Sequence, residues 1–257
     1  MKKLLILLIV LVIAGFGAYV WKSKHDKGTA VSVSKVAHDA KSKGSGDSPA
    51  NRGLRPVPAT YVFTGQGGDH ITTLKGASHV FPKEIAGVVT LQTGCNWKID
   101  FTYLKEKTKE RRMCTDATGA RELGSDEVIT FLGLTDRQHF TCGNDAWRIK
   151  FAAKVGDTWS FTCRTKDREV KHVVTLVDIA GTARLPGDTS TPAGIWHTHD
   201  VSQLSGASVG TDTTDFWWTH AGLPEQIDEH TNILTESVLG KTTYTVHAQY
   251  KATAQTK

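Results

Sequence analysis

Cysteine is scarce in this sequence, and the spacing of the four cysteines excludes several kinds of site. No two of them form a close pair, so the spacing excludes a Cys-x-x-Cys redox site and a zinc site built on paired cysteines. Because the first is Cys95, we expect no lipid-modified amino-terminal cysteine. The pattern is typical of structural disulfides, which form in an oxidising compartment.

Helical periodicity is missing after the leading segment, and so are strong catalytic motifs. No pair of carboxylates stands out, and the run Gly65–Gly68 is followed by no helical pattern, so it predicts a turn rather than a phosphate-binding loop. We therefore expect no catalytic residue and no cofactor, and the sequence favours a protein that is not an enzyme.

An excess of positive charge is confined to the first part of the chain. Residues 1–55 hold ten of the 31 Lys and Arg but three of the 26 Asp and Glu, which leaves 21 basic and 23 acidic residues after them. The remainder therefore has a net charge of −2, and nucleic acid is not an expected partner. The basic part either contacts anionic head groups or is simply a soluble linker.

The first long apolar run, Leu4–Trp21, predicts how the protein meets a membrane. It is close to the minimum length of a spanning helix, and lysines flank both of its ends. We expect residues 1–21 to be an uncleaved signal-anchor, which would make this a single-pass protein of the cell membrane. The alternative is a secreted protein, because Gly15 and Gly17 could serve a signal peptidase. Disulfides would put the domain on the extracytoplasmic side.

Composition divides the rest of the chain into three parts. Residues 22–58 are rich in Lys, Ser, Gly and Asp and predict a flexible basic linker. Residues 59–252 predict one β domain, long enough for a single sizeable core. Residues 253–257 are expected to be a polar tail.

Period-2 alternation recurs throughout the predicted domain. Apolar and polar residues alternate over 96–103 and over 243–250, and turn residues separate about a dozen such runs. Short strands at this spacing predict a mainly β fold, an antiparallel sheet curled into a half-barrel or barrel, with a two-layer β-sandwich as the alternative.

The cysteines flank these predicted strands. Cys95 opens the strand that begins at Asn96, and Cys114 closes the strand that returns; Cys142 and Cys163 bracket the next such region. Two local disulfides, 95–114 and 142–163, fit this pattern best among the three possible pairings.

Two histidines form a candidate metal site. His197 and His199 stand two residues apart on a predicted strand, so both imidazoles project from one face and can reach one ion. A third ligand could come from any of four residues, His172, Asp215, His220 or His230. The alternative is an ordinary polar strand surface.

Adjacent tryptophans form a candidate binding surface. Trp217 and Trp218 must point to opposite faces of a strand, so one enters the core and the other faces solvent, a ligand cavity or a partner, unless a second layer covers it.

The sequence Gly206–Gly210 matches the serine-hydrolase pattern G-x-S-x-G around Ser208. That motif requires a strand that turns into a helix, whereas a strand pattern follows here. We therefore predict a hairpin that joins 194–204 to 211–218.

The segment Asp215–Ile227 is similar to a strand–turn–strand of bacterial envelope proteins that have a lipoprotein-carrier-like curved sheet. The whole domain also resembles uncharacterised secreted or membrane-anchored proteins of Gram-positive bacteria, with a similar opening at 61–63, paired cysteines and a similar hairpin at 204–217. The resemblance implies a half-barrel that holds something apolar, or an envelope protein without catalysis.

These observations together predict a membrane-anchored, extracytoplasmic binding or scaffolding domain of the bacterial cell envelope. Its expected partners are the membrane, through the leading helix, and a lipid or other apolar ligand or an envelope component. The alternatives are a metal-dependent or serine hydrolase and a purely structural protein.

Overall fold

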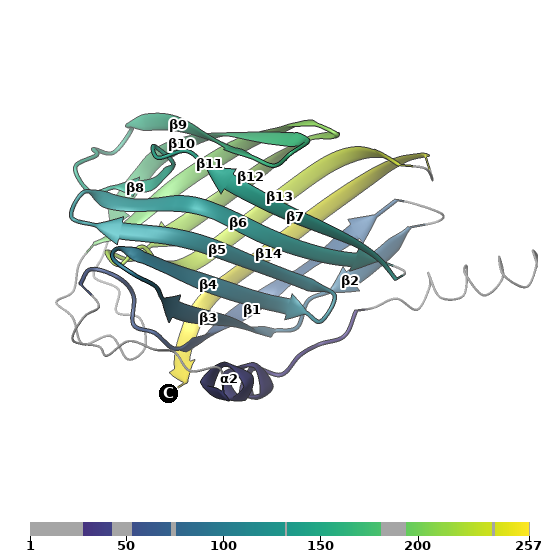
Figure 1. Cartoon of the computed structure of the whole chain (residues 1–257), viewed down its shortest axis with the longest axis horizontal. Coiled ribbons are helices and arrows are strands. Elements are labelled where there is room, and N and C mark those ends of the chain that lie inside the picture. The colour runs from purple at the N-terminus through teal and green to yellow at the C-terminus, as the bar shows by residue number, and fades with distance from the viewer. Residues whose placement is uncertain are drawn as a thin grey trace, which may run out of the picture.

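The chain folds into a closed antiparallel β-barrel (Figure 1). In the computed structural model, the described residues are 28–42, 53–72, 76–131, 133–180, 194–237 and 240–256. They form one helix, α2 (Val33–Ser42), and fourteen strands. The strands are β1 (Thr60–Ile71), β2 (Ala77–Val80), β3 (Glu84–Leu91), β4 (Asn96–Leu104), β5 (Lys107–Asp116), β6 (Gly119–Phe131), β7 (Leu134–Cys142), β8 (Trp147–Lys150), β9 (Thr158–Arg164), β10 (Arg168–Ala180), β11 (Ile195–Gly206), β12 (Ser208–Trp218), β13 (Pro224–Ser237) and β14 (Gly240–Thr256).

Twelve of these strands form the barrel wall. They follow one another from β14 back to β9, then through β7, β6, β5, β4 and β3 to β1, and β1 pairs with β14 to complete the ring. Strands β2 and β8 pair with β1 and β6 beside this ring. The predicted barrel is confirmed, and the sandwich alternative is wrong because one continuous ladder leaves no pair of separate sheets.

The run Gly65–Gly68 is not a turn, contrary to the prediction, but the middle of β1. On one side β1 pairs with β14 along its length; on the other it pairs with β3 up to Thr64 and with β2 from Gly68 onward. A Cβ on Gly65 would collide with the backbone carbonyl of Gln249 on β14. Glycine is therefore required here for close approach of two strands rather than for a reversal of the chain.

Both predicted disulfides are present. Cys95–Cys114 joins the start of β4 to β5 within a long ladder. Cys142–Cys163 joins β7 to β9, whose only described pairing consists of this cysteine pair and Thr141 with Arg164. The second disulfide therefore stands at the narrowest join in the barrel wall.

The ends of the domain differ from the boundaries expected from composition. Helix α2 lies inside the predicted linker and packs on β3 and β1, and the Thr29 backbone N–H donates to Glu106 at 2.7 Å. Strand β14 extends through the predicted tail to Thr256, opposite Thr60. The leading segment Leu4–Trp21 lies outside the described residues; among those that are described, no helix is long and apolar enough to cross a membrane.

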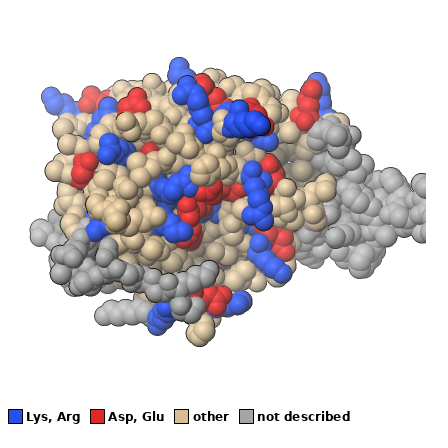
Figure 2. Space-filling view, viewed as in Figure 1, with Lys and Arg blue, Asp and Glu red and all other residues tan. Residues whose placement is uncertain are grey.

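Charges of both signs alternate on the outer face of β4, β5 and β6. Lys98 Nζ lies 2.7 Å from Glu110, and Arg112 pairs with both Glu110 and Asp126. Figure 2 shows basic and acidic side chains intermixed on this side of the molecule. Opposite charges neutralise one another locally, so this wall presents no field of a single sign.

Candidate functional site

The interior of the barrel is packed at one end. Trp97, Trp218 and Phe216 are 0–1% exposed there. The turn between β12 and β13 covers this end, because Thr115 Oγ1 accepts from Trp97 Nε1 and donates to the Ala221 carbonyl, both at 2.9 Å. Among the described residues, aromatic side chains therefore fill this end.

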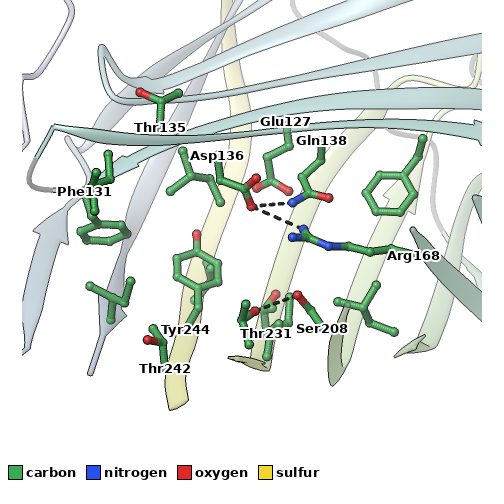
Figure 3. Close-up of a pocket in the computed structure, with 18 of the residues that line it drawn as sticks. Glu127, Phe131, Thr135, Asp136, Gln138, Arg168, Ser208, Thr231, Thr242 and Tyr244 are labelled. Atoms are coloured by element: carbon green, nitrogen blue, oxygen red, sulfur yellow. Dashed lines mark hydrogen bonds and ion pairs between the residues drawn. The ribbon is translucent and has the colours of Figure 1, made fainter. Parts of the chain in front are cut away.

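The other end of the barrel is hollow. It holds a cavity of about 400 Å³, whose lining includes polar groups but is mostly apolar (Figure 3). Six of the apolar lining residues are Ile129, Phe131, Phe140, Ile233, Tyr244 and Val246. Small-molecule sites in proteins have volumes of about 300–1,000 Å³, so the cavity is large enough for a small ligand.

The cavity opens to solvent beside β7. From Leu134 to Phe140 this strand pairs with β6 but, among the described strands, with no neighbour on its other side. Leu134 is 63% exposed and the Asp136 side chain 56% exposed, yet both also line the cavity. The short join between β7 and β9 thus leaves a mouth in the wall, and this mouth gives access to the interior.

Three polar side chains span the mouth. Asp136 accepts hydrogen bonds from Gln138 on the same strand, at 2.5 Å, and from Arg168 on β10, at 3.4 Å (Figure 3). The Nε atom of Arg168 is shielded from solvent and has no hydrogen-bond partner. The guanidinium as a whole lines the cavity, so it places a positive charge at the mouth.

Buried ion pairs form the floor of the cavity. Glu127 lies 3.4 Å from Lys107, and Glu229 lies 3.2 Å from Lys109. Burial alone would raise the pKa of Glu229, but the charges of Lys109 and Lys107 outweigh it and lower the pKa to about 2. Glu229 is therefore ionised at neutral pH, and its charge is balanced within the protein.

Tyr244 presents its ring to the cavity, because its hydroxyl forms hydrogen bonds with residues that do not line the cavity. The hydroxyl accepts from Lys107 at 2.5 Å and donates to Asp69 at 3.1 Å. Burial raises the pKa of Tyr244 well above its ordinary value, so the phenol stays neutral. His79 lies 3.0 Å from Asp69 and stacks on Phe131, another residue of the lining.

A second network of charges lies between the cavity floor and the packed end. Glu122 accepts from Arg111 at 2.8 Å and from Arg148 at 2.7 Å, and Arg148 also pairs with Asp200. His172 Nδ1 lies 2.9 Å from the same Asp200. Against the effect of burial, these cations lower the pKa values of Glu122 and Asp200 to about 2.

A smaller cavity of about 120 Å³ adjoins this network and includes Asp212. Burial and the nearby Glu229 charge raise the pKa of Asp212, although Thr231 and Thr214 donate hydrogen bonds to it at 2.6 and 3.0 Å. The centre of the barrel is therefore polar, but each charge faces a partner. This arrangement separates the packed end from the hollow end.

The two histidines predicted as metal ligands lie outside the barrel. His197 Nε2 and His199 Nδ1 lie 2.7 and 3.1 Å from the two carboxylate oxygens of Asp215 on β12. Asp215 is one of the four predicted third ligands, and the β11–β12 register places it opposite His199. The prediction that this pair binds metal remains a prediction.

The two tryptophans point to opposite faces of β12, as predicted. Trp218 is fully buried and donates to Thr198 Oγ1 at 2.9 Å, whereas Trp217 stacks on His197 on the outer wall at a centroid distance of 4.3 Å. Neither residue lines the cavity, so the cavity does not depend on them.

Ser208 lies at the start of β12 in the predicted hairpin. Its hydroxyl is 2.7 Å from the Thr235 hydroxyl, in the wall of the cavity. Since no helix follows it, the segment lacks the geometry of a nucleophile elbow.

The inward-facing charges of the barrel are not among the residues predicted from the sequence. Lys107, Lys109 and Arg111 alternate along β5 and point into the barrel, whereas the residues between them point outward. The sequence did hold one signal for them. Basic residues recur at every second position in the strand that contains Cys114, so all of them must share one face of the sheet.

Known proteins offer one weak structural similarity to this chain. No family model matches the chain, and no curated protein matches it. One solved structure that is similar is the hypothetical lipoprotein YmcC from Escherichia coli K12, with 10% identity, 79% of this chain and 94% of that chain covered, and a TM-score of 0.29. A similarity this weak carries no argument about function.

Proposed function

We propose that this barrel binds an amphiphilic molecule of the bacterial cell envelope, outside the cytoplasm. The observation that carries the proposal is the apolar cavity of about 400 Å³ with a mouth beside β7. The two disulfides support an oxidising compartment. The leading segment Leu4–Trp21 would hold the domain at the membrane, close to a source of acyl chains.

The ligand has an acyl chain and an anionic or carbonyl-bearing head group. The chain would lie against the ring of Phe131 and the side chain of Ile129, where it loses contact with water. The head group would lie at the mouth, where the guanidinium of Arg168 lines the cavity and can donate to its oxygen. The floor charges are already paired, so they do not select the head group.

Photolabelling tests this proposal on the full chain in membranes. The probe is a palmitic acid analogue that carries a diazirine, and labelled peptides are mapped by mass spectrometry. We expect labels on β6, β7, β13 and β14. Labels confined to Leu4–Trp21 would contradict the proposal, because they would report the bilayer alone.

Two substitutions on one strand give a matched comparison. Ile129→Trp fills the cavity, whereas Val128→Trp introduces the same side chain at the neighbouring position, on the opposite face of β6. We expect the first to abolish labelling of the domain and the second to preserve it. Equal labelling in both variants would place the probe outside the cavity.

A further inference from the structure

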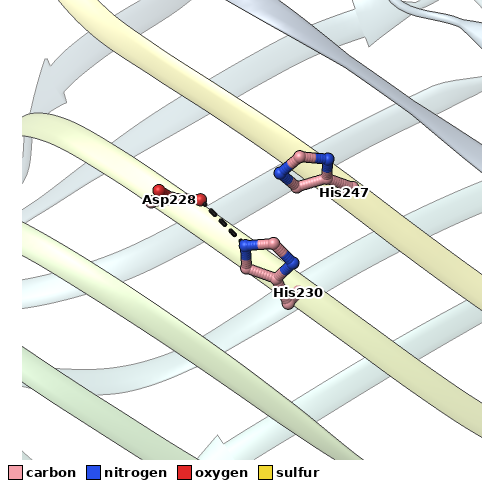
Figure 4. A group of neighbouring side chains, drawn as sticks. All are labelled: Asp228, His230 and His247. Carbon is pink, nitrogen blue, oxygen red and sulfur yellow. Dashed lines mark ion pairs between the residues drawn. The ribbon is translucent and has the colours of Figure 1, made fainter.

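The outer wall of the barrel carries a second cluster, separate from the cavity. Asp228 and His230 on β13 and His247 on β14 each offer one potential ligand atom, and all three atoms lie within 4.8 Å of one another (Figure 4). We propose that these three side chains bind a divalent transition-metal ion, with Zn²⁺ as the best match. The site lies on the outer face of the barrel, so metal binding there can be tested separately from ligand binding in the cavity.

Strand register brings the three residues together. His230 lies directly opposite His247 in the β13–β14 ladder, and Asp228 is two residues before His230, on the same face. The two imidazole rings stack with centroids 4.2 Å apart. Both histidines are exposed, so an ion can reach them from solvent.

The separation of the ligand atoms fits a tetrahedral ion. Asp228 Oδ1 lies 3.2 Å from His230 Nε2. Two ligands on a tetrahedral Zn²⁺ with bonds of about 2.0–2.1 Å are about 3.3 Å apart, so these two atoms are nearly in place. His247 needs a modest side-chain rotation to complete the set, which an exposed residue can make.

The carboxylate of Asp228 is arranged as a metal ligand would be. Its Oδ2 accepts a hydrogen bond from Gln249 at 3.0 Å, which fixes the plane of the group. Its Oδ1 is shielded from solvent and accepts no hydrogen bond, although it faces the His230 ring. The nearest polar atom that it faces is His230 Nε2 at 3.2 Å, so an ion would enter between these two atoms as the exposed His230 ring turns.

The neighbouring strand adds a second carboxylate. Asp215 on β12 lies directly opposite Asp228 in the β12–β13 ladder, and both side chains face outward. The oxygens of Asp215 already face His197 and His199, so Asp215 is not counted among the ligands. Two imidazoles and one carboxylate are a donor set that Zn²⁺ commonly uses, with the fourth position open to solvent.

Zinc competition tests the proposal on the untagged full chain. The protein competes for Zn²⁺ with a chromophoric chelator, and we expect one ion bound per chain. His230→Gln and His247→Gln should each weaken binding at least about tenfold. The control is His139→Gln, because His139 is also an exposed histidine beside an aspartate, Asp126, but among the described residues it belongs to no group of three potential metal ligands.

Each result has one meaning. Loss of Zn²⁺ binding in both variants, with retention in His139→Gln, supports the site, and circular dichroism checks that the variants fold. Absence of binding by the unaltered chain overturns it. Binding that survives His230→Gln but is lost in His197→Gln and His199→Gln also overturns it, and assigns the ion to the pair beside Asp215.

Discussion

At the scale of single residues, the unusual feature is charge inside a β-barrel. Arg148 contacts Glu122 and Asp200, and all three side chains are 3–4% exposed. Its guanidinium also lies 4.9 Å from the centre of the Phe161 ring. Removing the Arg148 guanidinium alone should be strongly destabilising, because the carboxylates of Glu122 and Asp200 would stay buried without their main partner.

We expect Arg148→Met to lower the free energy of unfolding by about 3–5 kcal/mol. Urea denaturation of the purified protein measures the change. The control is Arg164→Met, which removes an ion pair with Glu169 that is exposed on both sides and should cost less than about 1 kcal/mol. Equal losses in the two variants would mean that the buried network contributes no more than a surface pair.

At the scale of elements, two joins determine the shape of the wall. Strand β1 changes partner from β3 to β2 across Gly65–Gly68 while it stays paired with β14. Strand β7 pairs with β9 only at Thr141 and Cys142, and the unpaired edge before Thr141 forms the mouth of the cavity. Each join depends on few residues, so each can be tested by substitution.

Gly65→Ala should destabilise the barrel by about 1–3 kcal/mol, because the added methyl group meets the backbone of β14 rather than a movable side chain. Gln66→Ala, at the next position and exposed, should change stability by less than about 0.5 kcal/mol. Thermal unfolding followed by circular dichroism compares the two. A tolerated Gly65→Ala would show that β14 can move away.

Removal of the two disulfides should cost similar stability but should change amide exchange in different strands. By the chain-entropy model, the double variants Cys142→Ala/Cys163→Ala and Cys95→Ala/Cys114→Ala each lose about 3 kcal/mol, because the loops span 21 and 19 residues. In the first, we expect faster amide exchange concentrated in β7 and β9, whose ladder has two residue pairs. In the second, the long β4–β5 ladder should stay protected. Hydrogen exchange with mass spectrometry distinguishes them.

At the scale of the molecule, the barrel has three layers: an aromatic plug, a charged centre and a hollow end. The charged centre couples folding to pH. Glu122, Asp200 and Glu229 have pKa values of about 2 in the fold, against ordinary values of 4.5, 3.8 and 4.5. A lowered pKa stabilises the fold above the ordinary value, and this stabilisation is lost as the pH falls toward the folded value.

We therefore expect the free energy of unfolding to fall steadily as the pH is lowered from about 5 to about 2. Asp212 and Asp100, whose pKa values are raised, oppose this trend, but more carboxyl groups have lowered pKa values, and the largest shifts are those of Glu122, Asp200 and Glu229. Urea midpoints across the range measure the slope, and Arg148→Met should flatten it, since the lowered pKa values of Glu122 and Asp200 depend on that cation. A slope unchanged by the substitution would contradict this account.

The sequence by itself determined the features that depend on local spacing. Alternation predicted most strands because the side-chain period of a strand is two, and it placed Trp217 and Trp218 on opposite faces. The positions of the cysteines at strand ends predicted both disulfides correctly. The hairpin at Ser208 followed from the absence of a helix after it.

Only the tertiary structure decided what the barrel encloses and what its wall displays. Closure depends on β1 meeting β14, and the cavity has a mouth because β7 meets β9 at one end alone. Asp228, His230 and His247 come together through the register of two long strands. Each of these depends on pairing between residues distant along the chain, and local periodicity carries no information about such registers.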